Sequence, residues 1–360
     1  MEKMTLKKNK RQNIFRFLYI GGTIVAIMII GLLNHDIETL KEIIPQINKK
    51  YLGIALISLM VFWLSDALLL KQVTGYIYGK QKFYKSLKIG IMGLYYGALT
   101  PFASGGQPMQ VVYMRREGIP TGTSTSIVTV KFIVYELSLC LLYIIAMLAK
   151  GNFFYENYHH VFWLTTVGFI LNLIAVTFIS MVMLNRAVTE KIVHGFIRFL
   201  SKIKIIRKRE KRTLKVDTLI DDFFISSTYI KNGMSRFFIS IIISVINLAF
   251  LFAIPYFIYR AFGLNNESFI LIFTLQAFLF LAVSFVPLPG AVGASEGGFY
   301  IFFSKFFGSI PVFMPMIIWR FLTYYLILLV GSLIVVITEM RHIHRLKKER
   351  KEKRFKIEKI

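Results

Sequence analysis

The chain has a single cysteine, Cys140, among 360 residues, and it lies within an apolar run. One cysteine forms no intrachain disulfide and no Cys-rich metal site, so we expect a small buried apolar side chain there. No Walker A sequence is present, which argues against an ATP-driven pump within this chain. We therefore predict no metal site, no cofactor and no catalytic residues.

Acidic residues are also scarce, with 19 Asp and Glu against 44 Lys and Arg, and the formal net charge is +25. The basic residues gather in loops and tails between apolar runs, a pattern that favours cytoplasmic loops beside anionic lipid over nucleic-acid binding. The chain is 56% hydrophobic, with a mean hydropathy of +0.60. Such values are typical of a multi-span membrane protein.

We predict an all-α polytopic membrane protein with six full transmembrane helices and two re-entrant hairpins. A spanning helix needs about 20 mostly apolar residues, and six segments meet this length: 14–33, 51–70, 123–149, 161–184, 237–259 and 311–338. Two further apolar regions, 83–114 and 268–305, are interrupted by Gly and Pro. The alternative is eight or nine plain helices with Gly/Pro kinks.

The distribution of Lys and Arg sets the predicted orientation, because loops rich in these residues stay on the cytoplasmic side. Residues 1–16 hold six Lys or Arg, residues 71–88 hold five Lys and no acid, and the tail after Glu339 holds ten Lys or Arg. We therefore place both termini in the cytoplasm. Alternation of the spans then requires 83–114 to enter and leave on the cytoplasmic side and 268–305 on the outer side, each as a hairpin or a pair of helices.

Each half of the chain thus reads as span, span, hairpin, span, and an odd number of crossings per half inverts the second half relative to the first. We predict a first membrane repeat over 1–150, a second over 151–340 and a basic cytoplasmic tail over 341–360. The basic loop 185–236 carries apolar residues at helical spacing. This loop forms either an amphipathic helix on the inner membrane surface or a solvated linker.

The two broken regions carry the chain's most distinctive motifs. The first reads Thr100-Pro-Phe-Ala-Ser-Gly-Gly-Gln-Pro108, and the second reads Pro287-Leu-Pro-Gly-Ala-Val-Gly-Ala-Ser-Glu-Gly-Gly-Phe299. Irregular backbone at membrane depth survives only where protein buries it or a wet cavity solvates it. Two such breaks in corresponding positions point to the substrate site of a transporter.

Several residues of these motifs are candidates for headgroup binding. Ser104 and Gln107 supply neutral hydrogen-bonding groups, and the backbone N–H groups of Gly105 and Gly106 suit a phosphate. Glu296 suits an amine or a proton at a hydrated hairpin tip. The alternative for Glu296 is a helix-start carboxylate stabilised by the helix dipole.

Ionisable residues inside spans mark further candidates, because inserting one costs about 2.5–3.5 kcal/mol. Lys131 and Glu136 share span 123–149 but lie on faces about 140° apart, so they need partners elsewhere. Arg320 lies near mid-depth of its own span. Since Glu136 and Arg320 each occupy the span that follows a hairpin, we predict a contact between them across the two halves.

Two charged residues near the inner membrane surface have two interpretations each. Asp66, near the inner end of span 51–70, is either a site residue or an interfacial residue with access to water. Arg115, directly after the first hairpin, either binds a lipid phosphate or only enforces orientation.

Both motifs resemble those of the lysylphosphatidylglycerol synthase transmembrane-region family, and the resemblance covers roughly residues 14–340. This family includes the flippase portion of bacterial multiple peptide resistance factors. The resemblance implies a multi-pass protein of the bacterial plasma membrane that handles phospholipid, typically aminoacylated phosphatidylglycerol. Full-length members add a soluble domain that takes lysine from lysyl-tRNA. The segment after residue 340 is short and basic, so we expect no such domain here.

We therefore predict a phospholipid translocase whose partners are membrane phospholipids with anionic or aminoacylated headgroups. In this hypothesis Arg320 binds the phosphate, while Glu136, Glu296 or Asp66 binds an amino group or relays protons. One alternative is a phosphatidylglycerol lysyltransferase, acting alone or with a separate catalytic chain and engaging tRNA. The other is a non-catalytic scaffold for lipid enzymes. The sequence leaves the headgroup, the direction of movement, the coupling ion and formation of a homo-oligomer undetermined.

Overall fold

The structure is a computed structural model that describes residues 44–202 and 233–338, together with 217, 220, 221, 224 and 340. Across these residues the chain forms helices and short turns, and no strand occurs among them. The predicted span 14–33, most of the basic loop between residues 203 and 232 and the tail 341–360 lie outside the described residues.

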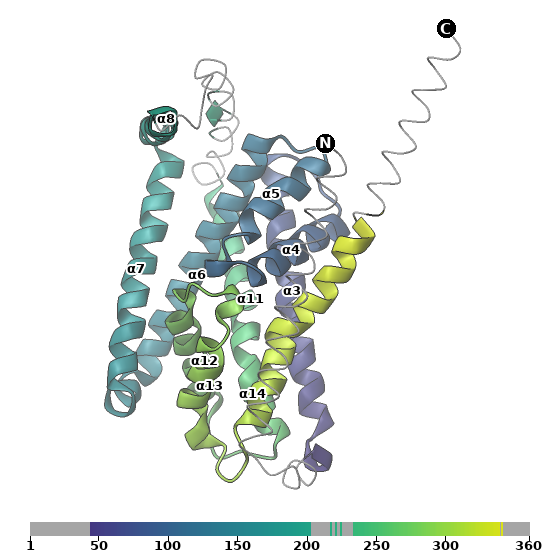
Figure 1. Ribbon diagram of the computed structural model, residues 1–360, viewed down its shortest axis with the longest axis vertical. Coiled ribbons are helices and arrows are strands. Elements are labelled where there is room, and N and C mark those ends of the chain that lie inside the picture. Colours follow the sequence, from purple (N-terminus) through teal and green to yellow (C-terminus); the bar gives the residue numbers. More distant parts are fainter. Residues whose placement is uncertain are drawn as a thin grey trace, which may run out of the picture.

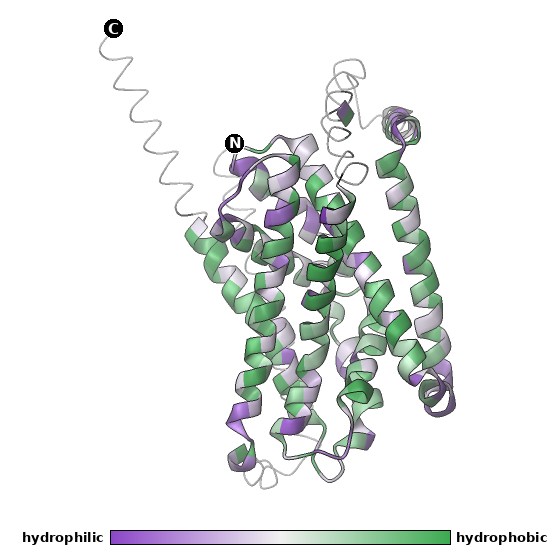
Figure 2. Ribbon diagram, turned by 180° about the vertical axis from the view of Figure 1, so that it is seen from behind, coloured by the Kyte–Doolittle hydropathy of each residue, from purple (hydrophilic) through white to green (hydrophobic). Residues whose placement is uncertain are grey.

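Five helices in the described part of the chain are long and apolar enough to cross a membrane: α3 (Lys49–Ile77), α6 (Thr121–Asn157), α7 (His159–Leu184), α11 (Met234–Ala261) and the helix Phe313–Thr338 that begins with α14 (Phe313–Arg320). Each contains most of one predicted span. The all-α polytopic class is therefore confirmed. Figure 2 shows these helices as largely hydrophobic, with hydrophilic residues gathered toward their ends.

Each Gly/Pro-broken region folds as two short helices that pack against each other. The first consists of α4 (Phe83–Ala98) and α5 (Gly106–Arg116), and the second of α12 (Phe269–Ser284) and α13 (Ala294–Phe303). Neither region is one continuous helix. Figure 1 shows the α4–α5 hairpin in the upper half of the molecule and the α12–α13 hairpin in the lower half. That each hairpin is re-entrant stays a prediction.

The two breaks share one backbone conformation. Each contains a single turn of 3-10 helix that begins with proline: η2 (Pro101–Ala103) and η3 (Pro289–Ala291). The second and third residues of each turn are left-handed, with φ of 53° and 52° in η2 and of 60° and 47° in η3. The two turns also contact each other near the middle of the molecule. The hairpin tips from the two halves therefore meet with matching local structure.

Helices α3 and α11 pack along each other and form the spine of the molecule. Asn247 of α11 joins them, because its Nδ2 donates to the carbonyl oxygen of Phe62 at 2.5 Å and to the Ser65 hydroxyl at 3.1 Å. Helix α6 packs against this pair and also contacts α5, α7 and α12. The largest apolar core draws on both halves of the chain, from Leu59 in α3 to Trp319 in α14.

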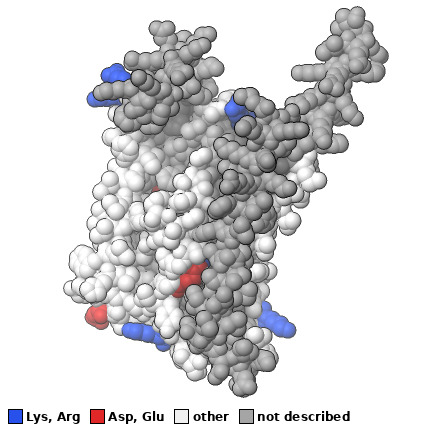
Figure 3. All heavy atoms as spheres, viewed as in Figure 1, with Lys and Arg blue, Asp and Glu red and all other residues white. Residues whose placement is uncertain are grey.

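The first part of the basic loop is helical, as α8 (Arg186–Lys202). Figure 1 shows α8 nearly end-on above α7, so its axis runs across the long helices. This first part is the helix of the two alternatives left open by the sequence, and its position on the inner membrane surface stays a prediction. In Figure 3 most of the described surface is uncharged, and Lys and Arg side chains show at its two ends.

Candidate functional site

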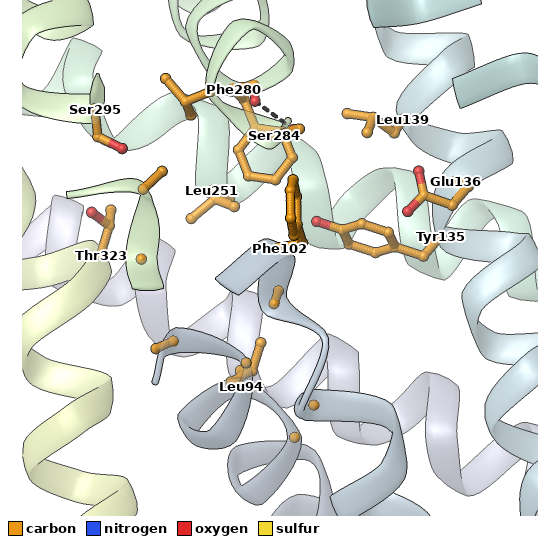
Figure 4. A pocket seen from close by; sticks show the side chains of 18 of the residues that line it. Leu94, Phe102, Tyr135, Glu136, Leu139, Leu251, Phe280, Ser284, Ser295 and Thr323 are labelled. Atoms are coloured by element: carbon orange, nitrogen blue, oxygen red, sulfur yellow. Dashed lines mark hydrogen bonds between the residues drawn. The ribbon is translucent and has the colours of Figure 1, made fainter. Parts of the chain in front are cut away.

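A cavity of about 590 Å³ opens where the two hairpin breaks meet. Its wall combines Phe102 and Ala103 from the first break with Gly290 and Ala291 from the second. The remaining lining comes from α3, α4, α5, α6, α7, α11, α12, the segment 285–288, α13, α14 and the π-helical segment η5 (Phe321–Tyr325). Figure 4 shows Tyr135 and Glu136 of α6 on one side of the cavity and Thr323 and Ser295 on the other.

Asp66 and Lys131 form a buried ion pair on this wall. The Lys131 Nζ lies 2.7 Å from Asp66 Oδ1 and 2.8 Å from Oδ2, and both side chains are at most 10% exposed. Asp66 reaches this position because α4 has Gly90 there, where a Cβ would lie 2.7 Å from Asp66 Oδ2. The pair joins α3 to α6, and Asp66 is not the water-exposed interfacial residue considered from the sequence.

Glu296 and Arg320 form a second buried ion pair. The Arg320 Nε donates to Glu296 Oε1 at 2.5 Å, and its Nη2 donates to the Gly290 carbonyl oxygen at 2.9 Å. Glu296 Oε2 accepts the backbone N–H of Gly293 at 2.7 Å, so the carboxylate also caps the start of α13. Arg320 lines the cavity, and together these bonds fix the shape of the second break.

The predicted contact between Glu136 and Arg320 is not formed. Arg320 turns to Glu296 because α13 packs against α14, whereas Glu136 faces α7. There the Asn172 Nδ2 donates to Glu136 Oε2 at 2.8 Å. Both Glu136 and Asn172 line the cavity, and Glu136 is only partly buried. Its carboxylate is therefore accessible from the cavity.

The candidate residues of the first motif divide into two groups. Gly106 and Gln107 line the cavity, whereas Ser104 is exposed and absent from its lining. The N–H of Gly105 is donated to the Thr100 hydroxyl at 2.8 Å, so in this structure it is not presented to a phosphate.

Arg115 lies apart from the cavity, exposed in the last turn of α5. Its place at the end of the helix suits both interpretations that the sequence left open for it.

Sequence reasoning missed several polar residues of the cavity wall. Gln110, Tyr135, Asn172, Gln276 and Trp319 all line it. Gln276 Oε1 and Trp319 Nε1 are buried and have no hydrogen-bond partner within the described part of the chain, and the two residues are 3% and 4% exposed. An unpaired acceptor and an unpaired donor on one cavity suit a bound polar ligand or ordered water. The signal for Asn172 and Gln276 was a lone amide in an apolar run.

Ser295 occupies the spacing Gly293-Ala-Ser-Glu-Gly297, which matches the nucleophile motif of α/β-hydrolases. That motif requires a turn from a strand to a helix, whereas Ser295 lies in the first turn of α13 after a break in a helical hairpin. Among the described residues that line the cavity there is no histidine. Within the described residues no group of three or more His, Cys, Asp or Glu is placed to hold a metal ion.

The sequence is similar to known membrane proteins over most of its length. The sequence model described as "Lysylphosphatidylglycerol synthase TM region" matches residues 19–331 of this chain. A UPF0104 membrane protein of Archaeoglobus fulgidus is 24% identical over 326 residues, which cover 87% of this chain and 95% of the relative. The family match covers both hairpins, four of the five long helices in full and the fifth, Phe313–Thr338, as far as residue 331.

Proposed function

The chain belongs to the lysylphosphatidylglycerol synthase transmembrane-region family, and from this premise we propose that it is a phospholipid translocase of the bacterial plasma membrane. The observation that carries the proposal is the cavity between the two hairpin breaks. Its volume of about 590 Å³ lies within the usual range of small-ligand sites, roughly 300–1,000 Å³. A glycerophosphate headgroup is a ligand of suitable size.

The cavity wall suits a headgroup that is polar and charged. Arg320 offers a guanidinium to a phosphate, and Gln107, Gln110 and Asn172 supply neutral hydrogen-bonding groups. Glu136 offers a carboxylate to an ammonium group or a proton. Apolar side chains form the rest of the lining and suit the glycerol and the start of the acyl chains.

The matching breaks support a mechanism by alternating access. We regard 1–150 and 151–340 as inverted repeats whose hairpins enter from opposite sides of the membrane, with both termini in the cytoplasm. Rocking of one repeat against the other would expose the cavity first to one leaflet and then to the other. The contact between η2 and η3 is the place where such movement would open and close a path.

The test is lipid movement in reconstituted vesicles. The purified chain is placed in phosphatidylcholine vesicles with fluorescent phosphatidylglycerol, and dithionite reports the label in the outer leaflet. We expect faster exchange between leaflets than in protein-free vesicles, and loss of that exchange in Arg320→Ala and Glu136→Gln. The matched control is Glu156→Gln, which makes the same substitution at an exposed position of the same helix.

Each alternative function has its own outcome. Formation of lysyl-phosphatidylglycerol from lysyl-tRNA and lipid by the purified chain would identify a lysyltransferase. Absence of both lipid movement and synthesis would contradict the proposal and leave the scaffold hypothesis. Wild-type rates in both Arg320→Ala and Glu136→Gln would contradict the assigned site.

A further inference from the structure

Glu136 stands out because the charges around the cavity are otherwise balanced. Asp66 is paired with Lys131, and Glu296 is paired with Arg320. Among the described residues that line the cavity, Glu136 is the one carboxylate with no Lys or Arg in ion-pair contact. When ionised, it therefore leaves a single uncompensated negative charge on the wall.

This charge has little to stabilise it. The one hydrogen bond given to Glu136 comes from a neutral amide, that of Asn172. Figure 4 shows Leu139 and Tyr135 beside Glu136, and the cavity surface is mostly apolar. A carboxylate without a cation in such surroundings is costly, and uptake of a proton removes the cost.

An anionic headgroup in the cavity raises the cost of an ionised Glu136 further. The phosphodiester of phosphatidylglycerol brings one negative charge into a cavity that already holds that of Glu136. Like charges in a site of low dielectric repel strongly, and a proton on one of them is the usual resolution. Since phosphodiesters are strong acids, the proton resides on the carboxylate.

We propose that Glu136 is a proton-binding site and that an anionic phospholipid crosses through the cavity together with one proton carried on the Glu136 carboxylate. This inference rests on the proposed translocase function. The proton binds a carboxylate oxygen on the side where the lipid enters and leaves it on the side where the lipid departs. One proton and one singly charged lipid make an electroneutral cargo.

The other ionisable groups that face the cavity do not perform this role as well. Asp66 is paired with Lys131, and Glu296 is paired with Arg320 and does not line the cavity. Tyr135 on α6 is a phenol whose ordinary pKa is about 10. Cys140 lies one turn along α6 and is not on the cavity wall. Helices α4, α5, α7, α11 and α12 contribute only uncharged side chains to the lining.

The experiment is the steady-state distribution of fluorescent phosphatidylglycerol across vesicles with an imposed pH difference. One pH unit corresponds to about 1.36 kcal/mol per proton, so coupling to one proton shifts the leaflet ratio by up to about tenfold. The lipid should accumulate in the leaflet that faces the more alkaline solution. Protein-free vesicles and Glu156→Gln serve as controls. Glu136→Gln should hold the ratio near that of protein-free vesicles, and Glu136→Asp should retain the asymmetry.

A second measurement needs no lipid movement. Infrared difference spectra of the purified chain between acidic and alkaline solution should contain the carbonyl bands of protonated carboxylic acids. Glu136→Gln should remove one component of these bands that Glu156→Gln leaves in place. Matching elution on size exclusion establishes that the variant is folded. If the wild type moves no lipid, the translocase proposal fails, and the infrared band still tests the proton site.

Two results would overturn the inference while leaving the translocase intact. One is wild-type lipid movement with no response to the pH difference. The other is movement of lysyl-phosphatidylglycerol but not of phosphatidylglycerol, independent of the gradient. In that second case Glu136 pairs with the ammonium group of the cargo instead of carrying a proton.

Discussion

Gly106 at the start of α5 faces the carbonyl oxygen of Gly93 in α4 so closely that a Cβ on Gly106 would lie 2.8 Å from that oxygen. The contact is to backbone, which has no flexible side chain to move aside. We expect Gly106→Ala to force the two arms of the first hairpin apart and to lower the free energy of unfolding by about 1–3 kcal/mol. Thermal unfolding in detergent, followed by circular dichroism, measures this.

The matched control is Gly53→Ala in α3, where a Cβ meets nothing within 4 Å. Because alanine is the better helix former, this change should raise stability by about 0.5–1 kcal/mol. Equal effects of the two substitutions on the free energy of unfolding would show that the close approach of α4 and α5 does not make Gly106→Ala destabilising.

The ion pair between Lys131 and Asp66 should behave as a unit. Lys131→Met leaves a buried carboxylate without its cation, so we expect a loss of about 3–5 kcal/mol in the free energy of unfolding. The double variant Lys131→Met with Asp66→Asn removes both charges and should recover most of that loss. A double-mutant cycle of chemical unfolding checks this. Additive effects of the two single substitutions would contradict the pairing.

The spans could be predicted from the sequence because a long apolar run is a local property of the chain. Pairing between charges depends instead on which helices become neighbours. Asp66 and Lys131 are 65 positions apart, and their spacing carries no sign of contact. Glu136 and Arg320 occupy equivalent places after their hairpins, which suggested a contact. The contact is not formed, because the Glu136 side chain points toward α7.

The hairpin breaks were visible in the sequence through their Pro and Gly residues, but the match between their backbones was not. Phe102 takes the position that Gly290 holds in the second break, with φ of 53° against 60°. Bulky residues rarely adopt left-handed φ, so local propensity predicts no such conformation at Phe102. It occurs in the turn that contacts η3 of the other half, a contact far from Phe102 in the sequence.

A charge cluster at the end of the first hairpin should make stability depend on pH. Lys85 Nζ lies 2.8 Å from Glu117 Oε2, and Lys88 Nζ lies 2.5 Å from Oε1. Burial raises the pKa of Glu117, but the hydrogen bonds from both lysines outweigh it and hold the pKa below its ordinary value of 4.5. The carboxylate thus stabilises the fold above that value, and its contribution is lost as pH falls through the lower pKa of the folded state.

Lys85 makes stability depend on pH in alkaline solution. Its hydrogen bond with Glu117 raises its pKa above 10.5, so its contribution is present below that value and is lost as pH rises through the raised pKa. We expect Glu117→Gln to lower stability by about 0.5–1 kcal/mol at neutral pH and by less in strong acid. The free energy of unfolding, measured across a pH series, tests both the loss in acid and the loss in alkaline solution. The same profile for Glu117→Gln and for Glu156→Gln would contradict the role of this cluster.

In the second break, an added methyl group should be tolerated less well at Gly290 than at Gly293. A Cβ on Gly290 would lie 2.1 Å from Cε2 of Tyr324, whereas one on Gly293 would meet nothing within 4 Å. Both glycines are left-handed, with φ of 60° and 85°, so both alanine variants carry backbone strain of about 1–2 kcal/mol. Only Gly290→Ala also displaces the Tyr324 ring, which lies 4.7 Å below the Arg320 guanidinium.

Tyr324 connects the two tips as well, because its hydroxyl donates to the Ala98 carbonyl oxygen at 3.4 Å. We therefore expect Gly290→Ala to destabilise the protein by about 1–3 kcal/mol more than Gly293→Ala and to slow lipid exchange, and Tyr324→Leu to rescue part of the Gly290→Ala loss by freeing space. Thermal unfolding and the vesicle assay measure the two effects. If both alanine variants lose the same stability, backbone strain alone accounts for them, and the ring does not hold the tips together.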